Sequence, residues 1–129
     1  MQDNTVNPVR NPSMQKIFTT DKGLPPTTKE TSNGVNCLFI GDIIGRPGRI
    51  AVRDNLPVLV EKYNIDIVIA NGENSAGGFG ITPQVAEELL NTHIDIITSG
   101  NHIWDKKEII DYIRDRNWLL RPANYPHGV

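Results

Sequence analysis

The chain has 129 residues, of which 38% are hydrophobic and 22% are charged, a composition typical of soluble globular proteins. Thirteen basic and fifteen acidic residues give a formal net charge of −2, which argues against binding of large nucleic acids through bulk positive charge. No apolar stretch approaches the ~20 residues that a membrane-spanning helix needs. The single cysteine, Cys37, excludes an internal disulfide framework and favours a reducing, cytoplasmic setting.

The first 34 residues differ in composition from the rest of the chain. They contain four prolines, and their few large apolar residues have no regular spacing. Such a stretch buries too little apolar surface to offset the entropy lost on ordering. We therefore predict a disordered tail over residues 1–34 and a globular part over residues 35–129.

Four short apolar runs predict the strands of a sheet. They lie at Cys37–Ile40, Ile65–Ala70, Ile94–Thr98 and Trp118–Leu120. The first run is unbroken and stops at a glycine, so it predicts a buried strand with Cys37 as an inert thiol in the core.

Between these runs the apolar residues recur with the period of a helix. The first stripe consists of Val52, Leu56, Leu59, Val60 and Tyr63. Pro57 falls inside it and predicts a kink or a break. The second helix is expected to have Thr82 as its N-cap and Pro83 as its first residue. The third is expected to begin at Asp105, with Glu108 completing a capping box.

Strands that alternate with helices predict right-handed βαβ units and an α/β fold with a parallel sheet. In such a sheet the ligand site lies at the carboxyl ends of the strands. Asp42 follows the first predicted strand, Glu73 and Asn74 follow the second, and Asn101 and His102 follow the third. Glycines flank these residues in each of the three loops, so we expect the side chains to meet at one edge of the sheet.

Taken singly, these side chains have ordinary explanations as turn residues, helix caps or surface groups. Together, one Asp carboxylate, one Glu carboxylate and an Asn carbonyl oxygen suit a hard cation such as Mg²⁺ or Mn²⁺, and a neighbouring imidazole widens the choice to Fe or Zn. A carboxylate can bridge two metals ~3.5–4 Å apart, as in centres that displace phosphate esters. An uncoordinated His102 would be free to protonate a leaving oxygen.

Three arginines, Arg46, Arg49 and Arg53, lie close together at the start of the first predicted helix. They could face an anionic substrate or form a solvated charged face, and the solvated face is the more common arrangement.

Several stretches of the chain resemble the YmdB-type branch of the bacterial calcineurin-like metallophosphoesterases. They are Leu38–Arg49, Asn71–Gly78, Gly100–Glu108 and Arg121–Pro126. The resemblance implies the N-terminal half of a metallophosphoesterase α/β/β/α sandwich. It also implies a metal-dependent phosphodiesterase that hydrolyses a small phosphoester, such as a 2′,3′-cyclic nucleotide, at a two-metal centre.

Carried over to this sequence, the family pattern assigns a role to each strand-end residue. Asp42 would bind the first of two divalent metals (Fe, Mn or Mg), Glu73 would bridge both, and Asn101 would bind the second. Asn74 would line the site as a ligand or catalytic group, and His102 would be the catalytic proton donor.

The same resemblance implies that the centre is incomplete in this chain. The family's remaining ligands are histidines of a C-terminal half, and His93, His102 and His127 are not placed to replace them. We therefore expect weak activity or none from this chain alone. Two alternative functions stay open. One is a non-catalytic remnant or split subunit whose partner supplies the missing half, and the other is a flavodoxin-like signalling or nucleotide-binding module. For assembly, a homo-oligomer also stays open.

Overall fold

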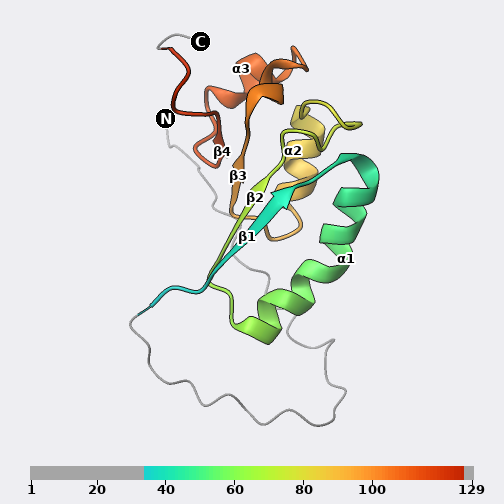
Figure 1. Cartoon of the computed structure of the whole chain (residues 1–129), viewed down its shortest axis with the longest axis vertical. Helices are drawn as coiled ribbons and strands as arrows, with labels where there is room; N and C mark the ends of the chain where they lie inside the picture. The colour runs from blue at the N-terminus through green and yellow to red at the C-terminus, as the bar shows by residue number, and fades with distance from the viewer. Residues whose placement is uncertain (1–33, 127–129) are drawn as a thin grey trace, which may run out of the picture. The chain divides into compact units, whose positions relative to one another are not determined.

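The structure, a computed structural model, describes residues 34–126. The predicted disordered tail lies outside the described residues, apart from Gly34. In chain order the elements are β1 (Cys37–Asp42), α1 (Gly45–Tyr63), β2 (Ile67–Asn71), α2 (Pro83–Leu90), β3 (Ile96–Thr98), the 3-10 helix η2 (Asn101–Trp104), α3 (Ile109–Ile113) and β4 (Leu119–Leu120) (Figure 1). None of the helices in this range is long and apolar enough to cross a bilayer.

The four strands form one parallel sheet in the order β1-β2-β3-β4. The predicted α/β fold with a parallel sheet is confirmed, and each of the four apolar runs contains a strand. The second and third strands begin two residues later than predicted, because the first residues of those runs lead into the strand rather than pair within it. Asp42 pairs with Asn71 and Asn71 pairs with Thr98, so the first three strands end level with one another.

The core lies on the face of the sheet that the helices cover. Successive strand residues point to opposite faces, and Ile40, Ala70, Ile97 and Leu119 share one face through their register. The fully buried partners of this face on the helices are Leu56, Ala86, Leu89, Ile103 and Ile109. Right-handed crossovers are expected to place successive helices on one side of such a sheet, and Figure 1 shows α1 and α2 together on one side.

The opposite face of the sheet is apolar and is not covered by a helix in residues 34–126. Phe39, Ile69 and Ile96 share this face through their register, and Phe39 is 62% exposed. The prediction of a buried first strand is therefore wrong, and so is the prediction of Cys37 as a core thiol, because Cys37 is exposed. The reason is the position of β1 at the edge of the sheet with one open face.

Helix α1 continues through Pro57, so of the kink or break predicted at this proline the break does not occur. Pro57 is exposed, and the residue four positions earlier lies on the same side of the helix. Pro57 has no N–H to donate to the carbonyl of Arg53, and both residues are exposed on the surface of the helix. The helix ends at Tyr63, and the capping residue Asn64 has a left-handed backbone (φ 49°) with its N–H bonded back to carbonyls of the last turn.

Helix α2 begins as predicted, with Thr82 as the N-cap and Pro83 as the first helical residue. The Thr82 hydroxyl accepts a hydrogen bond of 3.2 Å from the N–H of Val85. We expect Thr82→Ala to lower the free energy of unfolding by about 1 kcal/mol, because that N–H loses its partner. Urea unfolding measures the loss. Thr82→Ser keeps the hydroxyl and should retain most of the stability, and equal losses in both variants would contradict the cap.

Helices α2 and α3 are joined by the Tyr112 hydroxyl, which donates a short hydrogen bond to the Glu87 carboxylate. The Arg116 guanidinium lies over the same ring, 4.6 Å from its centroid. Burial, followed by the hydrogen bond to Glu87, raises the pKa of Tyr112 above its ordinary value of 10.0, although Arg116 opposes the shift. The folded protein thus favours the neutral phenol.

This raised pKa predicts a loss of stability at high pH. The contribution of Tyr112 is fully present below its ordinary pKa and is lost as the pH rises through the raised value. We expect the difference in unfolding free energy between the wild type and Tyr112→Phe to shrink between about pH 8 and about pH 11. Urea unfolding at both pH values measures it, and a constant difference would contradict the role of the phenol.

Candidate metal centre at the carboxyl edge of the sheet

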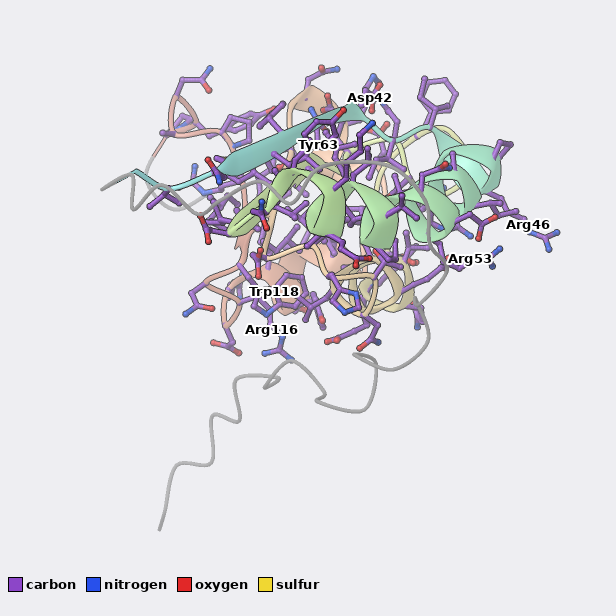
Figure 2. The ribbon with its side chains drawn as sticks, turned by 90° about the horizontal axis from the view of Figure 1, so that it is seen from below. Asp42, Arg46, Arg53, Tyr63, Arg116 and Trp118 are labelled. Atoms are coloured by element: carbon purple, nitrogen blue, oxygen red, sulfur yellow. The ribbon has the colours of Figure 1, made fainter. Side chains whose placement is uncertain are left out.

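The loops that follow β1, β2 and β3 meet at one edge of the sheet. Asp42 lies at the tip of the β1 arrow (Figure 2). The glycine-rich loop 72–80 follows β2, and residues 99–105 follow β3. The backbone ties the loops together, since the N–H of Ile43 donates to the carbonyl of Asn71 at 3.0 Å and that of Gly72 donates to the carbonyl of Thr98 at 3.0 Å.

Asn74 links the end of β1 to the loop after β2. Its Nδ2 donates to Asp42 Oδ2 at 2.8 Å, and its backbone carbonyl accepts from Gly45 at 2.9 Å and from Gly78 at 3.1 Å. Gly45 and Gly78 have φ values of 55° and 97°, a backbone that favours glycine. Because only Nδ2 can donate to a carboxylate, the amide orientation is fixed. The Asn74 Oδ1 atom is then buried, and it has no hydrogen-bond partner within residues 34–126.

Glu73 lies between the ends of β2 and β3. Its Oε2 accepts a hydrogen bond of 3.1 Å from the backbone N–H of His102. Its own N–H donates to Asn71 Oδ1 at 2.9 Å, and its Oε1 lies 3.5 Å from Asn71 Nδ2. A Cβ atom at Gly100 would lie 2.4 Å from Oε2. The backbone of the loop after β3 therefore comes close to the Glu73 carboxylate at a residue that has no side chain. The sequence reasoning missed Asn71, whose only signal is an amide side chain on the last residue of a strand.

The 3-10 helix η2 carries Asn101 and His102. Asn101 is exposed at its first position, and His102 is half-buried at its second. The predicted helix start at Asp105 is wrong, because α3 begins at Ile109 with no side-chain cap from Glu108. The Asp105 carboxylate instead lies 2.7 Å from His102 Nδ1, and this contact competes with helix capping.

The site residues fit part of a site for a hard cation. Asp42 and Glu73 supply carboxylate oxygens, and the unpartnered Asn74 Oδ1 is a buried acceptor that calls for a water or an ion. Such oxygen ligands suit Mg²⁺ or Mn²⁺. Within the described part of the chain, however, no group of three His, Cys, Asp or Glu side chains could hold a metal by itself. Amide oxygens or further ligands are therefore needed.

The three arginines of α1 divide into two kinds. Arg46 and Arg53 are exposed and point away from the molecule (Figure 2). Arg49 joins α1 to its neighbours, because its Nε lies 3.0 Å from both Glu88 carboxylate oxygens and an Nη donates to the Ser75 carbonyl at 2.6 Å. None of the three contacts Asp42 or Glu73 through a hydrogen bond in residues 34–126, which supports the solvated interpretation for Arg46 and Arg53.

These features define an open parallel α/β sheet whose strand-end loops meet at one polar edge. Comparison with protein families then gives its lineage. A family model described as YmdB-like protein matches residues 38–129, and the chain belongs to this family. The resemblance inferred from the sequence is thereby confirmed.

Three relatives illustrate the match. The chain is 50% identical over 91 residues to the 2′,3′-cyclic-nucleotide 2′-phosphodiesterase of Bacillus subtilis (strain 168), and the match covers 70% of this chain and 34% of the relative. A solved structure of a phosphatase from Mycoplasma pneumoniae is 34% identical, with a TM-score of 0.71 over 75% of this chain and 34% of that chain. A hypothetical protein from Thermus thermophilus is 41% identical, with a TM-score of 0.66 over 72% and 36%. The chain therefore spans about a third of the length of these relatives.

Proposed function

We propose that this chain supplies part of a two-metal centre that hydrolyses a small phosphodiester of the 2′,3′-cyclic nucleotide class. The observation that carries the proposal is the contact between Asp42 and Asn74, which leaves the buried Asn74 Oδ1 without a partner in residues 34–126. The name of the Bacillus subtilis relative supports the substrate class. The level ends of β1, β2 and β3 support a single shared site.

Each site residue has an assigned place in this proposal. Asp42 would hold the first metal, Glu73 would bridge both, and Asn101 would hold the second. Both Asp42 and Glu73 keep lone pairs beyond the hydrogen bonds they accept, since a carboxylate offers about four acceptor sites. Two divalent ions, Fe, Mn or Mg, would neutralise the phosphoryl oxygens and orient an in-line displacement.

Asn74 and His102 would have roles other than binding the second metal. Asn74 would orient Asp42 through its Nδ2 and present Oδ1 to the site. His102 would donate a proton to the leaving oxygen, the role that histidine most often has in general acid catalysis. Its backbone N–H donates a hydrogen bond to Glu73, which supports a position of His102 beside this carboxylate.

The proposed centre is short of ligands in this chain. Two carboxylates and two amides provide fewer donors than two six-coordinate ions require, and the described residues hold no larger cluster. We therefore expect weak Mn²⁺ binding and little or no turnover from the chain alone.

Two measurements test the proposal. Mn²⁺ binding is followed by electron paramagnetic resonance, and hydrolysis of 2′,3′-cyclic AMP is assayed with Mn²⁺ or Fe²⁺. Binding of Mn²⁺ that disappears in the Asp42→Asn variant supports the site. Turnover that persists in excess chelator would overturn metal dependence, and robust turnover by the isolated chain would overturn incompleteness. Absence of Mn²⁺ binding even at millimolar concentration would overturn the site.

The open face of the sheet favours a second candidate function, that of a subunit which binds a partner supplying the rest of the centre. Phe39 is 62% exposed on this apolar face, beside Ile69 and Ile96. Burying such a face against another sheet is strongly favourable. The part of the Bacillus subtilis relative beyond the matched region serves as the probe in analytical ultracentrifugation. A heterocomplex that Phe39→Ser weakens supports this function, whereas a homodimer or a monomer contradicts it.

A further inference from the structure

We propose that Asp105 is a positioning residue that fixes the tautomer and orientation of His102, so that Nε2 is the ring atom presented to the substrate. The inference rests on the proposed role of His102 as proton donor. The sequence suggests only a helix cap for Asp105, whereas the structure places its carboxylate 2.7 Å from His102 Nδ1.

The chemistry of the contact determines the tautomer. An ionised carboxylate can only accept hydrogen bonds, so the hydrogen between the two groups must reside on Nδ1. A neutral His102 then carries its lone pair on Nε2, and when the ring holds a second proton that proton lies on Nε2, from which it can pass to the leaving oxygen. A distance of 2.7 Å is in the range of charge-assisted bonds, which are about twice as strong as neutral ones.

The backbone of η2 holds the two residues in this arrangement. In a 3-10 helix, side chains three residues apart lie one above the other, which places Asp105 directly beside His102. The N–H of Asp105 donates to the His102 carbonyl at 3.2 Å, and the N–H of His102 donates to Glu73 Oε2 at 3.1 Å. Both residues are therefore anchored to the strand-end loops before any substrate arrives.

A second contact restrains the imidazole ring. The Phe79 ring, from the glycine-rich loop 72–80, lies 5.4 Å from the His102 ring with an interplanar angle of 68°. Asp105 fixes one ring nitrogen, and Phe79 restricts rotation about the side-chain bonds. No hydrogen bond within residues 34–126 uses Nε2, so this atom is left for the leaving oxygen.

Nitrogen-15 chemical shifts of the imidazole test the proposal in the full chain, without metal or substrate. In the neutral ring, which a pH series of the spectra identifies, we expect the Nδ1–H tautomer for His102 in the wild type. Asp105→Asn offers an amide that can donate as well as accept, so the Nδ1–H signal should give way to Nε2–H or to a mixture. A wild-type His102 already in the Nε2–H form or in a mixture overturns the proposal.

A matched control is available on α3. Asp111 forms an exposed ion pair of 3.2 Å with Arg114 at the same spacing of three residues. Asp111→Asn removes the same charge and should leave the His102 shifts unchanged. An equal change in both variants would assign the effect to net charge and overturn positioning by Asp105.

A kinetic measurement extends the test to any preparation that hydrolyses 2′,3′-cyclic AMP. There we expect Asp105→Asn to lower kcat at least about tenfold, as removal of groups that orient a functional histidine commonly does, with KM unchanged within about twofold. An unchanged kcat overturns the positioning role. If no preparation is active, the proposed function fails, while the nitrogen shifts still decide how Asp105 acts on the ring.

Discussion

Replacing Gly100 by alanine should weaken Mn²⁺ binding at least about tenfold, although Gly100 is not itself a proposed ligand. The new Cβ would lie 2.4 Å from Glu73 Oε2 and 2.7 Å from Oε1, well inside van der Waals contact. Glu73 accepts a hydrogen bond from the His102 N–H, and moving its carboxylate away from the new methyl group would disturb that bond. Because the atoms met are the far end of the Glu73 side chain, which can rotate, the free energy of unfolding should fall by less than about 1 kcal/mol. Electron paramagnetic resonance and urea unfolding measure the two effects.

Gly41 provides the matched control for this substitution. It also lies near the carboxyl end of a strand, but a Cβ at Gly41 would meet no atom within 4 Å. Gly41→Ala should therefore keep Mn²⁺ affinity within about twofold of the wild type and change stability by less than about 1 kcal/mol. Comparable losses in both variants, or an unaffected Gly100→Ala variant, would show that close approach to Glu73 is not what matters.

The sequence predicts best those features that depend on neighbours along the chain. The cap at Thr82 and the start at Pro83 follow from local hydrogen bonding and from the fixed φ of proline, and the structure confirms both. The strands follow from apolar runs, and their alternation with helices gives the parallel sheet. The level strand ends then bring the loops of Asp42 and Glu73 to one edge.

Features that depend on distant parts of the chain could not be predicted in the same way. An apolar run has the same composition in a central strand and in an edge strand, so the exposure of Cys37 is decided by what packs beside β1. Asp105 matches the sequence pattern of a helix cap, yet its carboxylate contacts the His102 ring instead of capping a helix. Gly100 lies close to the side chain of Glu73, which is 27 residues earlier in the chain, and no local sequence pattern encodes this contact.

Pro57 illustrates a local rule that fails for a physical reason. Proline inside a helix removes one donor and normally costs about 3 kcal/mol or more. Helix α1 retains its continuity because the proline lies on the exposed side, while Leu56 next to it is buried in the core. The packing of one face thus outweighs the defect on the other, and only the tertiary structure shows which face Pro57 occupies.

The substitution Glu73→Gln tests the metal centre most directly, because it removes a charge with little change in size. We expect the variant to lose Mn²⁺ affinity by on the order of 100-fold, since hard cations depend on the number of charged oxygen ligands. The glutamine carbonyl can still accept the His102 N–H, so the free energy of unfolding should change by less than about 1 kcal/mol. Mn²⁺ titration and urea unfolding separate loss of a ligand from loss of the fold.

Glu61→Gln is the control for net charge, since Glu61 is exposed on α1, and it should bind Mn²⁺ as the wild type does. Asp42→Asn completes the comparison. If both Asp42→Asn and Glu73→Gln lose the ion, two strand ends share one site, as a two-metal centre requires. If Asp42→Asn loses the ion while Glu73→Gln retains it, the cation depends on β1 alone. Binding would then resemble that of a flavodoxin-like signalling module, and the bridging role of Glu73 would have to be abandoned.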